Sequence, residues 1–115
     1  MYSFKQAQTL CPDCPDVYLH RGQINLLSDN FDASEKDFNE AVKLKPEFSV
    51  AQAQRLYLLY RKALNESNST RAEELSRDFK KLVKKFPSCV ETHSLYAQVE
   101  TIVVFLGKYF LLNSN

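Results

Sequence analysis

The sequence is poor in the residues that make tight turns, and it carries little net charge. Two glycines and four prolines occur in 115 residues, which favours a helical chain over a sheet of short strands, because every strand reversal needs a turn. The net charge of +1 supplies no strong field to attract nucleic acid or anionic lipid. No apolar run reaches the roughly 18 residues that span a bilayer. The longest near-continuous run, 102–112, is interrupted by Gly107 and Lys108.

Cysteines are few and odd in number. There are three, which argues against a disulfide framework and for a reducing compartment. Residues 1–10 lack an apolar core behind a basic start, so no secretory leader is expected. Cys11 and Cys14 form a single CxxC, and only Cys89 and His93 are available to complete a zinc site. Two small residues in a loop are therefore favoured over a metal or redox site.

The pattern Phe-x2-Ala-x2-Leu-x-Pro occurs twice, 34 residues apart, and a degenerate third copy follows. A period of 34 residues that ends in proline is typical of a tetratricopeptide (TPR) array, in which each repeat is a helix–turn–helix. TPR arrays bind peptides and proteins. The copies are Phe4, Ala7, Leu10 and Pro12; then Phe38, Ala41, Leu44 and Pro46; then Phe79, Leu82, Lys85 and Pro87.

Helical periodicity and the prolines divide the chain into repeats. We predict an all-α right-handed solenoid of about six helices, with helices over 2–10, 16–28, 31–45, 48–64, 70–85 and from about residue 88. The TPR array covers 1–98, and an apolar tail without the TPR pattern covers 99–115. Within the array we predict a partial repeat 1–14, a full repeat 15–48, a lengthened repeat 49–89 and the start of a further repeat 90–98.

Three local features carry specific expectations. Gly22 lies in the middle of a predicted helix, which indicates a close approach by another helix. The segment from Pro46 to Pro87 is seven residues longer than one period, and 65–70 is expected to be a polar loop closed by a capping box with Thr70 as the N-cap. The tail is expected to prolong the last helix or to fold back, with a break at Gly107.

Several stretches of the sequence match one particular TPR family more closely than they match TPR proteins in general. Together they look like the large TPR import receptor of the mitochondrial outer-membrane translocase, and the lengthened unit fits that receptor too. The resemblance covers roughly residues 4–98. It rests on the stretches Asp16–Gln23, Asp37–Ala41, Leu44–Pro46, Ala51–Gln54, Tyr60–Ala63, Lys84–Pro87 and Tyr96–Gln98.

The resemblance implies a receptor at the mitochondrial outer membrane, on its cytosolic face. It implies that the protein takes preproteins with apolar internal signals from cytosolic chaperones, that it works with other translocase subunits, and that it has no enzymatic activity, cofactor or metal. This stretch alone, without a membrane span or a nucleic-acid partner, is expected to be soluble in the cytosol. The Lys, Asn and Arg clamp of chaperone-binding TPR proteins is not present at the corresponding positions.

The first helix of each TPR repeat lines the concave side of the solenoid. We therefore predict a partner-binding groove with apolar and amide side chains. Such a groove can bind apolar segments without strict sequence specificity. For each tyrosine, packing between repeats is an equally good interpretation. The predicted groove residues are Leu19, His20, Gln23, Leu26, Gln54, Tyr57 and Tyr60.

Two other functions stay open from the sequence. One is a generic TPR scaffold or a co-chaperone adaptor, which would keep a strict 34-residue period. The other is a small metal or redox protein built on Cys11 and Cys14. The lengthened repeat favours the import receptor over the first, and the lack of further metal ligands disfavours the second.

Overall fold

The structure, a computed structural model, describes the backbone of residues 14–112 and the side chains of residues 14–105. No strand occurs in residues 14–112, so the predicted all-α fold is confirmed. The helix predicted over residues 2–10 lies outside the described residues. The helices of the described part are α2 (Pro15–Leu27), α3 (Phe31–Leu44), α4 (Ser49–Asn65), α5 (Ser69–Lys85) and α6 (Val90–Leu112).

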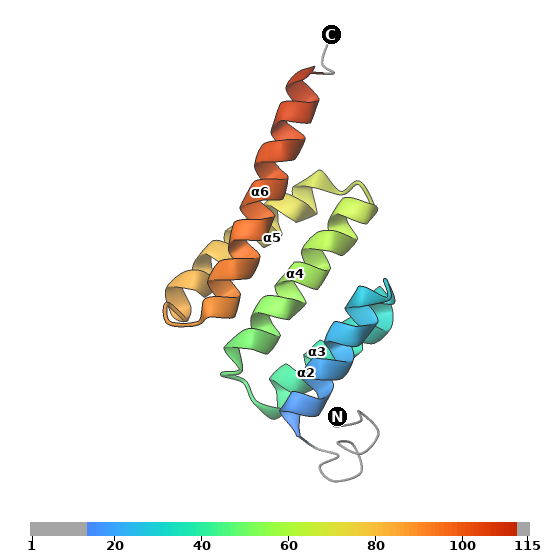
Figure 1. The fold of residues 1–115 in the computed structure, drawn as a ribbon, viewed down its shortest axis with the longest axis vertical. Coiled ribbons are helices and arrows are strands. Elements are labelled where there is room, and N and C mark those ends of the chain that lie inside the picture. Colours follow the sequence, from blue (N-terminus) through green and yellow to red (C-terminus); the bar gives the residue numbers. More distant parts are fainter. Residues whose placement is uncertain (1–13, 113–115) are drawn as a thin grey trace.

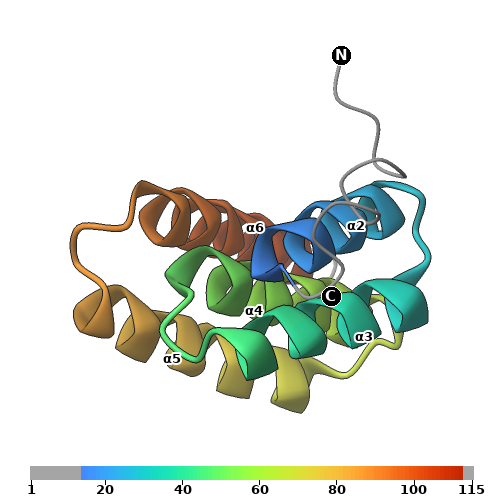
Figure 2. The ribbon, with the colours of Figure 1, turned by 90° about the horizontal axis from the view of Figure 1, so that it is seen from below.

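The helices pack around α4, which contacts each of the other four (Figure 1). Seen from below, α2 and α6 lie on one side of the molecule, α3 and α5 lie on the other, and α4 runs between them (Figure 2). Two buried clusters result. The α2–α3–α4 cluster centres on Phe38, Ala41 and Leu58, and the α4–α5–α6 cluster centres on Tyr60 and Phe79.

The close contact between helices that was predicted at Gly22 is present. A Cβ added to Gly22 would lie 2.5 Å from Cε1 and 2.6 Å from Cδ1 of the Phe38 ring. Phe38 is fully buried, and the Ser34 hydroxyl donates a 2.7 Å hydrogen bond to the Gly22 carbonyl. Because only glycine leaves room for the ring, Gly22 determines how closely α2 and α3 approach.

The seven additional residues of the lengthened repeat lie in its helices. The α2–α3 turn and the α4–α5 turn have three residues each, and their central residues, Asp29 and Ser67, have φ of 57° and 55°. Both turns use the same pattern of backbone hydrogen bonds. By contrast α4 is four residues longer than α2, and α5 is three residues longer than α3. The expected polar loop over 65–70 is therefore confirmed in place but is shorter, at 66–68, because α4 and α5 each gain about one helical turn.

The N-cap of α5 also differs from the prediction. Asn68 caps the helix, and its side-chain oxygen accepts a 3.1 Å hydrogen bond from the Arg71 amide. Thr70 lies inside the helix, and Glu73 pairs with Arg77 at 3.8 Å. The capping box with Thr70 as N-cap is thus wrong. Asparagine and threonine are both good N-caps, and the three-residue turn selects Asn68.

Helix α6 runs without interruption from Val90 through Gly107 to Leu112. The tail therefore prolongs the helix, as one of the two predicted outcomes stated, but the predicted break at Gly107 is absent. Val99 is fully buried, whereas Val104 and Phe105 are more than half exposed. The end of α6 extends past the other helices in Figure 1. Over the described residues, no helix is both long and apolar enough for a membrane span.

Candidate peptide-binding surface

Four of the seven predicted groove residues have buried side chains. Leu19 and Leu26 are 6% and 5% exposed and pack in the α2–α3–α4 cluster. Tyr60 is 1% exposed in the α4–α5–α6 cluster, where burial raises the pKa of its phenol. Gln54 is 9% exposed. These four side chains are therefore largely inaccessible to a partner.

The other three predicted residues are accessible. His20 is exposed, whereas Gln23 and Tyr57 are half-buried. Tyr57 packs against both buried clusters and also lines an open hollow. Tyr57 is therefore accessible, whereas Tyr60, three residues further along the same helix, is buried.

The hollow has a volume of about 570 Å³ and lies along the C-terminal half of α4. The α2–α3 turn and the start of α3 bound one side of it, and α6 bounds the other. We call it the α4 hollow, and its lining residues are Asp29, Phe31, Tyr57, Arg61, Leu64, Asn65 and Ile102.

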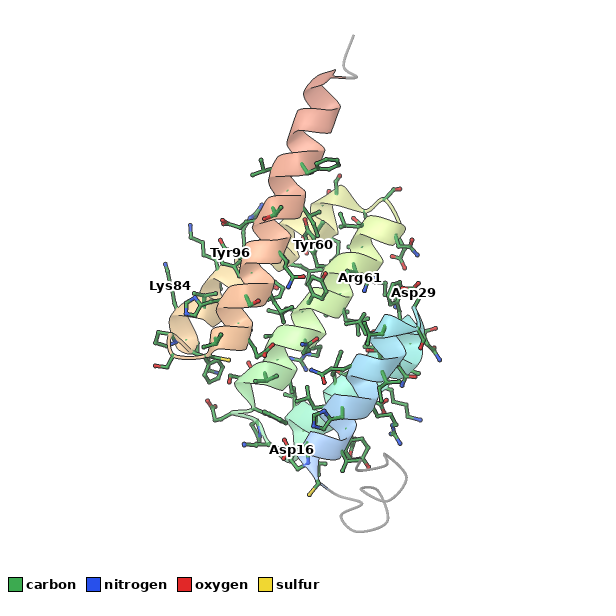
Figure 3. All side chains as sticks on the ribbon, in the orientation of Figure 1. Asp16, Asp29, Tyr60, Arg61, Lys84 and Tyr96 are labelled. Atoms are coloured by element: carbon green, nitrogen blue, oxygen red, sulfur yellow. The ribbon has the colours of Figure 1, made fainter. Side chains whose placement is uncertain are left out.

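The two charged residues in this lining are paired with each other. Arg61 Nη2 lies 3.2 Å from Asp29 Oδ1, and the Arg61 guanidinium carbon lies 5.6 Å from the centroid of the Phe31 ring. In Figure 3, Arg61 lies on the side of α4 that faces the α2–α3 turn, and Tyr60 lies between α4 and α6. Because the pair is neutral overall, the α4 hollow suits an uncharged apolar group flanked by hydrogen-bonding backbone.

A second set of contacts fixes the wall on the α3 side. Lys62 Nζ lies 3.6 Å from Asp32 Oδ1 and 3.8 Å from Glu35 Oε1. Both carboxylates belong to the first turns of α3, next to Phe31. Exposed ion pairs contribute little to stability individually, but here they join α4 to the start of α3 beside the hollow.

Helix α2 is held against α3 by a buried polar network that the sequence pattern does not reveal. The Asp37 carboxylate, whose side chain is 5% exposed, accepts bonds of 2.9 Å from Arg21 Nε and 2.6 Å from Arg21 Nη2. It accepts a further 2.9 Å bond from Asn25. The hydrogen bond with Asp37 raises the pKa of Arg21. Arg21 also lies over the Tyr18 ring, at 5.1 Å from its centroid. This network fixes the orientation of α2, which leads into the α2–α3 turn at one side of the α4 hollow.

None of the cysteines and histidines within residues 14–105 lines the α4 hollow. Cys14 is disulfide-bonded, which the odd cysteine count did not predict, and Cys11 lies outside the described residues. Cys89 is a free thiol. His93 Nε2 lies 2.7 Å from the Pro87 carbonyl oxygen. No three His, Cys, Asp or Glu side chains within the described range come together in a way that could hold a metal ion.

Sequence reasoning missed most of the α4 hollow, although part of it follows the helical period. Arg61 and Leu64 come four and seven residues after Tyr57, so they share its helix face. The period gives no signal for Phe31 and Ile102, because they come from α3 and α6 and reach the hollow only through the tertiary fold.

Comparison with known proteins agrees with the resemblance drawn from the residues. The chain is 40% identical over 105 residues to mitochondrial import receptor subunit TOM70 of Homo sapiens. It is 39% identical over the same length to the subunits of that name from Mus musculus and Rattus norvegicus. The match covers 91% of this chain but only 17% of each relative. No protein-family model matches the sequence.

Proposed function

We propose that this chain is a peptide-binding TPR module of a mitochondrial import receptor, and that the α4 hollow holds apolar segments of preproteins. The chain is about 40% identical to import receptor subunits over nearly its whole length. The fold supplies two and a half helix pairs of the kind that bind peptides. On this proposal the chain works by binding, at the cytosolic face of the mitochondrial outer membrane and together with other translocase subunits.

The α4 hollow is the observation that carries the proposal. Its walls come from three separate parts of the chain, and Tyr57, Leu64 and Ile102 offer apolar surface. The Arg61–Asp29 pair leaves no net positive charge there to recognise an acidic peptide. Preference for apolar segments over the acidic C-terminal peptides of chaperones follows from this neutrality.

Binding of fluorescent peptides tests the proposal. An apolar segment of a preprotein without charged residues should bind the full chain, and an acidic C-terminal peptide should bind more weakly. Tyr57→Ala should weaken binding of the apolar peptide about tenfold or more, because aromatic side chains at the centre of a site contribute strongly. Tyr18→Ala is the matched control, since Tyr18 is also half-buried but lies on α2 outside the hollow.

Two results would overturn the proposal. One is tighter binding of the acidic peptide than of the apolar peptide. The other is an equal loss of affinity in Tyr57→Ala and Tyr18→Ala, which would show that the hollow does not select the ligand. Circular dichroism melting of both variants confirms that each is folded at the temperature of the titration.

A further inference from the structure

The N-terminal ends of α4 and α6 lie next to each other. The two helices contact one another and run in the same direction, so both begin at the same end of the molecule (Figure 1). Helix α4 begins at Ser49 and α6 begins at Val90. The first amides of a helix carry partial positive charge and have no partner within the helix. A place where two such ends meet therefore favours an anion.

Cys89 places a thiol at this junction. It directly precedes α6, and its carbonyl oxygen accepts a 3.3 Å hydrogen bond from the His93 amide, so it occupies the N-cap position. The thiol hydrogen-bonds with the Ser49 hydroxyl of α4 and with the amides of Glu91 and Thr92 in α6. Cys89 is free and half-buried, so a small reagent in solution can reach a thiol that both helices hold in place.

The Thr92 hydroxyl beside this thiol is a buried polar group that lacks a good partner. Thr92 is fully buried, and its Oγ1 makes no well-formed hydrogen bond. The polar group next to it is the Cys89 thiol, and the sulfur of a thiol is only a weak acceptor. A buried hydroxyl left without a partner lowers the stability of the folded chain. An oxygen atom bonded to the sulfur would give the Thr92 hydroxyl a strong acceptor.

We propose that Cys89 is a site of reversible oxidation by hydrogen peroxide, and that the Thr92 hydroxyl binds the oxygen of the sulfenic acid that forms. The proposal goes beyond the peptide-binding function and does not depend on it. The thiolate sulfur attacks one oxygen of the peroxide, so an S–O bond forms and the O–O bond breaks. Sulfur loses two electrons, and the hydroxide that leaves takes up the proton released by the thiol. The products are the sulfenic acid and water.

The surroundings of Cys89 favour both the reaction and its reversal. Partial burial raises the pKa of the Cys89 thiol, but hydrogen bonds, those with Ser49 and Thr92 among them, outweigh burial and lower the pKa overall. The thiolate is the form that attacks peroxide. Cys14 is disulfide-bonded and offers no thiol to displace the new oxygen. Glutathione restores Cys89 in two steps: one molecule forms a mixed disulfide and releases water, and a second displaces the Cys89 thiol as glutathione disulfide forms.

Mass spectrometry of the full chain tests the proposal. After treatment with hydrogen peroxide in the presence of dimedone, which traps sulfenic acids, the adduct should map to Cys89. The matched control is Ser88→Cys in a Cys89→Ser background, because it moves the thiol by one residue to an exposed position. This control should form the adduct about tenfold more slowly, since reactivity follows thiolate formation and not exposure alone.

Thr92→Val separates the proposed role of the hydroxyl from a structural one. Valine has nearly the same shape, so the melting temperature should stay the same or rise when the unpartnered hydroxyl is removed. The sulfenic acid at Cys89 should nevertheless disappear about three to ten times faster at a fixed glutathione concentration, because it loses a hydrogen bond. Thr101→Val is the matched control, since Thr101 is exposed and lies further along α6.

Four results would overturn the proposal. The first is an adduct that maps away from Cys89, and the second is equal reaction of the thiols at positions 88 and 89. The third is an unchanged lifetime of the sulfenic acid in Thr92→Val. The fourth is a clear fall in the melting temperature of Thr92→Val, which would show that the hydroxyl is already well bonded in the reduced protein.

Discussion

Gly22→Ala should destabilise the protein even though alanine favours helices. The added Cβ would lie 2.5, 2.6 and 3.1 Å from Cε1, Cδ1 and Cζ of Phe38, well inside van der Waals contact. The ring cannot move aside into solvent because Phe38 is fully buried. Overpacking of this kind costs about 1–3 kcal/mol, whereas the gain in helix propensity is about 1 kcal/mol.

The atoms involved decide which effect is larger. The two shortest distances join the new methyl group to ring carbons of a buried aromatic residue, so relief requires α2 and α3 to separate. Separation would also lengthen the 2.7 Å hydrogen bond between Ser34 and the Gly22 carbonyl. We therefore expect overpacking near the upper end of its range and a net loss of about 1–2 kcal/mol. For a chain of this size the melting temperature should fall by about 5–10 °C.

Thermal melting followed by circular dichroism checks this result. Gly22→Leu should destabilise more than Gly22→Ala, because its side chain is larger. The double variant Gly22→Ala/Phe38→Leu should be closer in stability to Phe38→Leu than additivity predicts, since the smaller side chain removes the clash. A Gly22→Ala variant that melts above the wild type would refute the reasoning, because propensity alone would then have decided the outcome.

Three further predictions concern a buried charge, a helix cap and a thiol. Asp37→Ala should lower the free energy of unfolding by about 3 kcal/mol, because Arg21 and Asn25 lose a buried acceptor. The control Glu74→Ala, which breaks the exposed Arg71–Glu74 pair, should lower it by at most about 1 kcal/mol. Equal losses for the two variants in urea denaturation would contradict this. Asn68→Ala should lower the free energy of unfolding by about 1 kcal/mol through loss of the α5 N-cap, and Thr70→Ala should lower it less. The reverse order in the same assay would indicate that Thr70 is the cap. Partial burial raises the pKa of the Cys89 thiol, but hydrogen bonds, led by that with Ser49, outweigh it and lower the pKa overall. The thiolate should therefore form at lower pH than in free cysteine, and Ser49→Ala should move the midpoint of Cys89 alkylation to higher pH; an unchanged midpoint would exclude Ser49 as the cause.

The sequence predicted the helices because prolines and period mark them strongly. It also predicted the close contact at Gly22, because a glycine inside a helix lowers helix stability and is typical of a place where another helix packs closely. It predicted the long helix over 48–64, which the structure has as Ser49–Asn65. It made the next connection too long, because polar residues over 65–70 indicate a loop although the connection has only three residues and α5 begins at Ser69. The polarity of Asn65 and Ser69 does not prevent helix formation at exposed helix ends.

The candidate site was harder to predict than the fold. Helix α4 is apolar over most of its surface around Leu56, Tyr57, Leu59 and Tyr60, so periodicity cannot say which tyrosine faces the core. Both of its faces are buried because α4 belongs to both clusters. The Asp37 network joins residues 12 and 16 positions apart, a pairing that no local pattern indicates.

The claim that the α4 hollow holds apolar preprotein segments is tested most directly by site-specific photo-crosslinking. A benzophenone amino acid in place of Tyr57 should crosslink to a labelled apolar segment of a preprotein, and an excess of unlabelled segment should abolish the product. The same group in place of Tyr18, also half-buried but outside the hollow, should give little product. Equal or stronger crosslinking from position 18 would contradict the assignment of the binding surface.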